Sequence, residues 1–138
     1  MKITARLHNR EGEHQVSLST NDNVHSLSIA PKATGFGSSV NGGELLFLAL
    51  ATCYCNDIYR EAAKRGIRVE SVEVEVEGEF GAEGESARNV RYHAKIAAQA
   101  SDEAIRALAV ETDQVAEIQN SMRAAIPVTL GKVDTVSV

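Results

Sequence analysis

Tryptophan is absent from this 138-residue sequence, and the only aromatic residues are three tyrosines and three phenylalanines. The core must therefore be mostly aliphatic, and a platform that stacks single-stranded nucleic acid is not expected from so few rings. An excess of positive charge is also lacking, because Lys and Arg total 14 against 19 Asp and Glu, a net charge of −5. Nucleic-acid-binding domains usually carry a basic stripe. The composition therefore predicts no nucleic-acid partner.

Cysteine is scarce, and long apolar runs are missing. The only cysteines are Cys53 and Cys55, which excludes a secreted fold built on disulfides. The longest apolar run, Leu45 to Cys53, is about half the length of a membrane span. The first residues contain no apolar segment of the kind that forms a signal peptide. These absences predict a cytoplasmic protein with reduced thiols and no membrane partner.

The length predicts one domain, residues 1–138, because a domain usually has roughly 100–200 residues. Alternating apolar residues predict a strand meander in the first thirty residues and a hairpin of Val69–Phe80 with Val90–Ala98. In that hairpin Val72, Val74 and Val76 should face the core, while Glu73, Glu75 and Glu77 face solvent. Helical spacing follows Ser101, with a break near Thr112 and Asp113, and a last strand is expected from Val128 to Val136.

A long central helix is predicted between Asn41 and about Arg65. Asn41 can cap its start with Glu44 three residues on, and Gly66 is a good stop. The first half of this helix is apolar all round, so it should be buried on every side. The element order, with strands and helices segregated, is that of an α+β fold. A sheet and the later helices can cover only part of the long helix, so a second subunit is the natural remaining cover.

Chemistry is expected at the two cysteines of this helix. Their side chains point about 200° apart around the helix axis, so they cannot readily form a disulfide with each other. The same divergence makes them a poor metal chelate, and no other residues resemble a zinc site. No metal and no cofactor are therefore predicted. Both cysteines are either small hydrophobic residues of the core, or one of them is a reactive thiolate, which needs a nearby cation and access.

The segment Gly42–Cys53 resembles the central-helix motif of the OsmC/Ohr family, which reads Asn-Pro-Glu-x-Leu, then small apolar residues, then Ala-Cys. The residues in register are Asn41, Leu45, Ala49, Ala51 and Cys53. Gly66-Ile67 and the segment Ile126–Leu130 resemble later elements of that family. The resemblance implies an OsmC-like fold, with antiparallel sheets wrapped around a long central helix in an intertwined homodimer.

The resemblance also implies an activity. The family's best understood members reduce organic hydroperoxides, and Cys53 occupies the position of their attacking cysteine. Its thiolate would become a sulfenic acid as the O–O bond breaks. An arginine in an N-terminal turn activates that thiolate in those members, and Arg10 matches it here. The alternative for Arg10 is an ordinary exposed residue of a turn.

Two departures from the family pattern bear on this activity. The glutamate that pairs with the activating arginine falls at Gly43, while the adjacent Glu44 points about 100° away and is needed as a helix cap. The family's resolving cysteine falls at Ala116, and a serine that follows it falls at Gln119. An external thiol must therefore resolve Cys53, or the protein does not reduce peroxides.

The remaining candidates are Cys55 and Asp57. A resolving role for Cys55 would need local unwinding of the helix. Asp57, one turn after Cys53, is either a solvated residue or, if buried near the thiol, a charge that disfavours the thiolate. The sequence therefore supports a stress-related, one-cysteine reductase of small hydrophobic peroxides. Its alternatives are a non-catalytic dimeric module that binds a small apolar ligand at the dimer interface, and a structural protein with a vestigial site.

Overall fold

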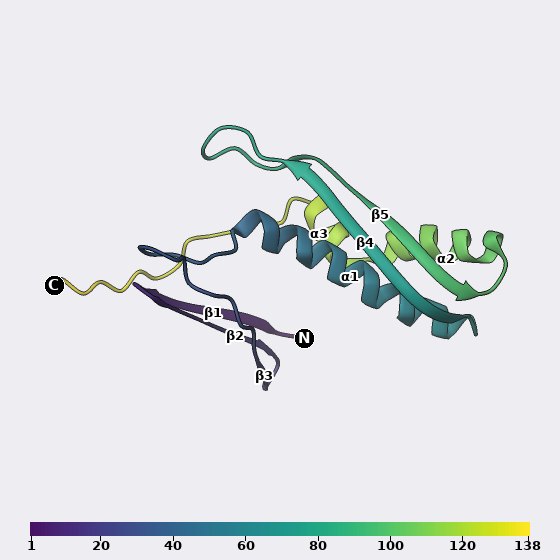
Figure 1. The fold of residues 1–138 in the computed structure, drawn as a ribbon, viewed down its shortest axis with the longest axis horizontal. Coiled ribbons are helices and arrows are strands. Elements are labelled where there is room, and N and C mark those ends of the chain that lie inside the picture. Colours follow the sequence, from purple (N-terminus) through teal and green to yellow (C-terminus); the bar gives the residue numbers. More distant parts are fainter. The chain divides into compact units, whose positions relative to one another are not determined.

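The computed structural model describes all residues, 1–138, and its eight elements are drawn in Figure 1. The strands are β1 (Ile3–Arg10), β2 (Glu13–Thr20), β3 (Asn23–Ser26), β4 (Arg68–Glu79) and β5 (Arg88–Gln99). The helices are α1 (Gly42–Lys64), α2 (Asp102–Val115) and α3 (Glu117–Arg123). Both sheets are antiparallel, and the strands and helices are segregated along the chain. The α+β class predicted from the element order is confirmed.

The chain divides into two compact units, Met1–Leu46 and Phe47–Val138, which are called the N-terminal unit and the C-terminal unit here. This division does not test the prediction that residues 1–138 form one domain, which stays a prediction. No helix in the structure combines the length and the apolar character that crossing a membrane requires.

The N-terminal unit is a meander in the order β1-β2-β3. Ile3, Ala5 and Leu7 pair with Thr20, Leu18 and Val16 across the strands, which gathers the apolar side chains on one face. The opposite face is polar, because Arg6 pairs with Ser17 and His8 pairs with Gln15. On the apolar face, Ile3 and Leu7 are 65% and 63% exposed. The predicted third strand is shorter than expected and ends at Ser26.

The central helix begins and ends where its capping residues predict. The Asn41 Oδ1 accepts from the backbone N–H of Glu44 at 2.9 Å, and Glu44 Oε2 accepts from the Asn41 N–H at 2.8 Å. This reciprocal pair is a capping box. At the other end, Gly66 adopts a φ of 66°, the left-handed conformation that commonly stops a helix.

Burial along α1 is uneven in the single chain. The burial expected for the apolar first half included a second subunit and stays a prediction, since Leu48 is 57% exposed here. The buried residues of the helix are Leu50, Tyr54, Asp57, Ile58, Glu61 and Ala62. The second half packs against the rest of the C-terminal unit.

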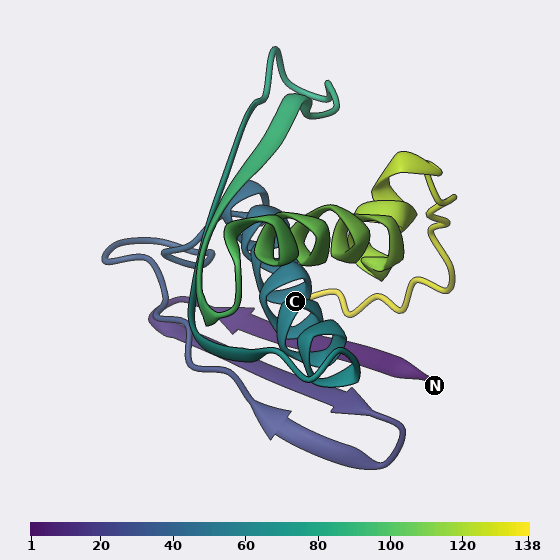
Figure 2. The ribbon, with the colours of Figure 1, turned by 90° about the vertical axis from the view of Figure 1, so that its right-hand side faces the viewer.

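The core of the C-terminal unit forms where α1, α2 and the β4–β5 hairpin meet. Ile58 and Leu108 are both completely buried in it, and α2 lies beside α1 in the unit (Figure 2). Valines 72 and 74 of β4 pack against this core, whereas Glu73 and Glu75 are exposed. The predicted facing is therefore confirmed for Val72, Val74, Glu73 and Glu75. It weakens at Glu77, which is partly buried like Val76 and pairs with Arg91.

Two C-terminal predictions need correction. The helix break lies at Ala116, between α2 and α3, instead of near Thr112, because Thr112 is fully buried and donates from its hydroxyl to the Leu108 carbonyl within α2. The predicted last strand is wrong, because residues 126–138 carry no strand. Val128 and Leu130 alternate as a strand would, but they are 91% and 86% exposed and pair with no sheet edge. An alternating pattern becomes a strand only when an edge accepts its hydrogen bonds.

Candidate functional site: the Cys53 cluster

Four charged or nucleophilic side chains meet at the middle of α1, and they are called the Cys53 cluster. Cys53, Asp57 and Arg60 come from α1 at spacings of four and three residues, which places them on one face of the helix. Glu117 comes from the first residue of α3. All four belong to the C-terminal unit.

The sulfur of Cys53 faces two carboxylates. Its thiol donates to Asp57 Oδ2 at 3.6 Å, and Glu117 Oε2 lies 3.9 Å from the same sulfur. The nearby backbone N–H of Ile118 acts in the opposite direction and lowers the pKa of the thiol. Cys53 itself is half-buried, and Asp57 is only 5% exposed. Of the two alternatives for Asp57, the structure therefore supports the buried neighbour of the thiol and not the solvated residue.

Arg60 holds the other oxygen of each carboxylate. Its Nη1 lies 2.9 Å from Asp57 Oδ1 and 3.3 Å from Glu117 Oε1. Its Nε donates to Glu61 Oε1 at 2.9 Å. The guanidinium thus binds the far side of the carboxylates, and their remaining oxygens point towards the sulfur.

These contacts set the protonation of the cluster. Burial raises the pKa of the Cys53 thiol, and the nearby charges of Asp57 and Glu117 raise it further against the opposing N–H of Ile118. Burial and Glu117 also raise the pKa of Asp57, which Arg60 only partly offsets. The pKa of Glu117 is lowered by its own backbone N–H and by Arg60. The thiol is therefore held in its protonated form, and Glu117 is the firmer anion of the two acids.

The cluster also contains the one group of side chains whose donor atoms lie close enough to share a metal ion. Cys53, Asp57 and Glu117 offer ligand atoms within 4.8 Å of one another. Arg60 already binds one oxygen of each carboxylate. We therefore describe the cluster as an ion-paired network of a thiol and two carboxylates.

Cys55 lies apart from this cluster. It lines a shallow hollow of about 270 Å³ with Ala51, Thr52, Asn56 and Val74. The two cysteines are both free thiols, in keeping with the predicted divergence of their side chains. Asp57 and Glu117 thus contact Cys53, whereas Cys55 faces the β4 side of the helix.

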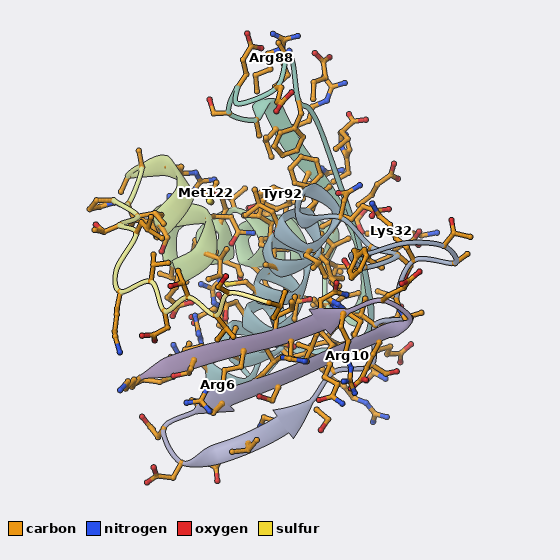
Figure 3. All side chains as sticks on the ribbon, turned by 90° about the vertical axis from the view of Figure 1, so that its left-hand side faces the viewer. Arg6, Arg10, Lys32, Arg88, Tyr92 and Met122 are labelled. Atoms are coloured by element: carbon orange, nitrogen blue, oxygen red, sulfur yellow. The ribbon has the colours of Figure 1, made fainter.

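Arg10 and Glu44, the other predicted site residues, belong to the N-terminal unit. Arg10 projects from the end of β1 (Figure 3), and its guanidinium Nη2 lies 2.6 Å from Glu13 Oε2 across the β1–β2 turn. Glu13 is therefore the carboxylate that holds Arg10, where the family pattern would use a residue at Gly43. Glu44 caps α1 as described above. Their roles at the thiol stay predictions.

Sequence reasoning missed Arg60 and Glu117. The spacing of Cys53, Asp57 and Arg60 on one helix face was a usable signal for the arginine. For Glu117 the only hint was its position next to Ala116, where the family's resolving cysteine would lie. The contact between Cys53 and Glu117 joins residues 64 positions apart, which no local pattern can predict.

The buried residue Gln119 supports the placement of α3. Its Nε2 donates to the Leu50 carbonyl at 2.9 Å, and the residue is 3% exposed. This bond joins α3 to α1 one turn before Cys53 and so fixes where Glu117 meets the thiol. The Gln119 Oε1 has no hydrogen-bond partner.

Comparison with known proteins decides the family. Residues 35–131 match the family described as OsmC-like protein. The chain belongs to the OsmC-like family. This match spans α1, the β4–β5 hairpin, α2 and α3, and so includes the whole Cys53 cluster. No curated protein sequence matches the chain.

Solved structures share the fold at low sequence identity. An OsmC-like protein from Mycoplasma pneumoniae is 18% identical with a TM-score of 0.59, over 87% of each chain. An organic hydroperoxide resistance protein, OsmC, from Legionella pneumophila is 21% identical with a TM-score of 0.59, over 89% of this chain and 90% of that one. An OsmC-like protein of unknown function from Vibrio cholerae is 14% identical with a TM-score of 0.57, over 88% and 93%. At these identities the likeness establishes an OsmC-like fold.

Proposed function

We propose that this OsmC-like protein reduces organic hydroperoxides with Cys53 as its single redox cysteine. The observation that carries the proposal is the Cys53 cluster, in which proton-accepting groups surround a half-buried thiol on the central helix. Family membership and the hydroperoxide resistance protein from Legionella pneumophila support the substrate class. We also propose a role in the response to peroxide stress.

The chemistry needs two thiols from outside the chain for each turnover. Cys53 reacts as Cys–SH + ROOH → Cys–SOH + ROH, in which the sulfur is oxidised and the O–O bond is reduced. One external thiol then forms a mixed disulfide with release of water, and a second restores Cys53 and leaves as the oxidised disulfide. The sequence has no cysteine after Cys55, so we assign resolution to a small thiol.

Stopped-flow oxidation by an organic hydroperoxide tests this proposal. Cys53→Ser should abolish the reaction, whereas Cys55→Ser should retain it. Arg10→Ala should slow the reaction if Arg10 activates the thiolate. Equal loss in both cysteine variants, or a parent rate no higher than that of a free thiol, would remove the peroxidase proposal.

A second candidate function is a non-catalytic module that binds a small apolar ligand. It is favoured by the two carboxylates at Cys53, since they raise the thiol pKa and so reduce the population of the reactive thiolate. This function predicts an inert Cys53 together with a small molecule that stays bound through purification. Mass spectrometry of the native protein would detect that molecule.

We propose a homodimer as the working form for either function. Large apolar side chains are exposed in both units, among them Leu7, Leu48 and Val110 at 63%, 57% and 63%. Soluble monomers rarely leave many such residues uncovered in contiguous patches. A second copy of the chain is the partner that would cover them, and the experiment that tests it is given in the Discussion.

A further inference from the structure

Reduction of a hydroperoxide by a thiol needs two proton movements. The sulfur must lose its proton as it attacks oxygen, and the departing alkoxide must gain one. In the C-terminal unit, the side-chain atoms that reach the Cys53 sulfur are carboxylate oxygens of Asp57 and Glu117. Arg60 binds the far oxygens of these groups. The cluster is thus arranged for proton transfer more than for stabilising a free thiolate.

Asp57 has the geometry of a proton acceptor for this thiol. The Cys53 thiol donates to its Oδ2 at 3.6 Å, within the range of hydrogen bonds that involve sulfur. The ion pair with Arg60 at 2.9 Å fixes the direction of the carboxylate. Asp57 is only 5% exposed, so solvent has little access to this bond. Glu117 is farther from the sulfur, and its side chain is 66% exposed.

We propose that Asp57 is a catalytic residue that takes the proton of the Cys53 thiol and returns it to the alkoxide. The inference rests on the proposed peroxidase function and adds a residue to it. The sulfur attacks the distal peroxide oxygen as its proton passes to Asp57 Oδ2. The O–O bond breaks with both of its electrons going to the alkoxide, which takes the proton from Asp57. The products are Cys53–SOH and an alcohol, and Asp57 regains its carboxylate form.

The charges around Asp57 suit this role. Burial and the neighbouring Glu117 raise the pKa of Asp57, and a proton carrier works best when its pKa approaches the working pH. Glu117 keeps its charge because its own N–H and Arg60 lower its pKa. Arg60 and Glu117 are positioning residues in this scheme. The groups that face Asp57 are thus Cys53 and Arg60 from its own helix and Glu117 from α3.

Two matched variants separate proton transfer from simple repulsion. Asp57→Asn and Glu117→Gln each remove one negative charge beside the sulfur, but only the first removes the proton acceptor. Both are made in the Cys55→Ser background, and each is treated with tert-butyl hydroperoxide and with iodoacetamide. Alkylation by iodoacetamide needs the thiolate, but its iodide leaving group takes no proton.

The proposal predicts that Asp57→Asn changes the two reactions of the Cys53 thiol in opposite directions. Both variants should be alkylated faster than the parent, because loss of a carboxylate lowers the thiol pKa. With the peroxide, Asp57→Asn should be slower by about tenfold or more, near the lower end of acid–base contributions because the lower thiol pKa offsets part of the loss. Glu117→Gln should react as fast as the parent or faster. Peroxide oxidation of Asp57→Asn at or above the parent rate would overturn the proposal.

The pH profile of the Cys55→Ser protein gives a test that does not depend on how Asp57→Asn folds. Transfer to Asp57 predicts a rate that stays nearly constant with pH between the pKa values of Asp57 and the thiol. A reaction of the free thiolate alone predicts a rise of about tenfold per pH unit below the thiol pKa, and that result would contradict the proposal. If the protein is not oxidised at any pH, the proposed function itself fails, which is a distinguishable outcome.

Discussion

The two units of the chain reach burial in different ways. Every fully buried residue lies in the C-terminal unit, where Ile58 and Leu108 are completely buried and a hairpin and two helices surround them. The N-terminal unit has an equally regular sheet, yet none of its residues is buried. A sheet needs a second layer on its apolar face. The C-terminal unit therefore carries its own core, whereas the three strands of the N-terminal unit form a single layer.

The largest expected effect is dissociation of the proposed homodimer by a charge on the apolar face of the N-terminal unit. Leu7→Asp places a charge on the apolar face of the β1–β2–β3 sheet, so we expect it to dissociate the dimer, because obligate interfaces are extensive and apolar. Gln15→Asp, on the opposite and polar face, is the matched control. Sedimentation of both variants and the parent at micromolar concentration measures the effect. A parent that is monomeric with native helicity would contradict the dimer.

Truncation within each unit gives the next largest effect. Leu108→Ala should lower the free energy of unfolding by about 2–5 kcal/mol, because it leaves a cavity in a completely buried site. Leu7→Ala in a free monomer should cost under about 0.5 kcal/mol, since its site is exposed. Urea unfolding measures both. A large cost at Leu7 that depends on protein concentration would show that a partner covers it.

The start of α1 tests whether Glu44 has a role beyond capping. Asn41→Ala should lower the unfolding free energy by about 1 kcal/mol, as loss of an N-cap does. Glu44→Gln should change little, because glutamine also completes a capping box. Thermal unfolding of the two variants and the parent measures both changes in stability. Slower peroxide oxidation of Cys53 in Glu44→Gln, at unchanged stability, would restore Glu44 as a site residue.

The smallest effect concerns an ion pair in the C-terminal unit. Burial tends to raise the pKa of Asp113, but hydrogen bonds from Arg123 and Tyr92 outweigh it and hold that pKa below its usual range. A lowered carboxylate pKa stabilises the fold above the unfolded value of about 3.9, and this contribution disappears as pH falls through the folded value. Since the side chain of Asp113 is 37% exposed, the contribution should be below about 1 kcal/mol.

Asp113→Asn checks that assignment by acid titration of stability. The parent should exceed the variant by a constant amount above about pH 5, and the difference should shrink as pH falls below about 4. Arg123→Gln should give the same pattern, because it removes the partner cation. A difference that grows towards low pH would mean that the pKa of Asp113 is raised in the folded chain.

The fold was predictable where local patterns decide it. Alternation of valine and glutamate set the register of β4, and Asn41 with Gly66 set the bounds of α1. The strand expected at Val128–Val136 failed, because a strand also needs an unpaired edge, and its position is not encoded locally. Within the Cys53 cluster, the sequence singled out Cys53 as the candidate thiol and named Asp57 as its neighbour. It could not predict the contact with Glu117, because that contact depends on how α3 packs on α1.

Direct detection of the oxidised thiol tests the central claim most closely. The parent protein is treated with one equivalent of an organic hydroperoxide in the presence of a β-diketone that traps sulfenic acids, and tandem mass spectrometry locates the adduct. We predict one adduct per chain at Cys53 and one equivalent of alcohol released. An adduct at Cys55, or an unlabelled chain with the peroxide intact, would contradict the account.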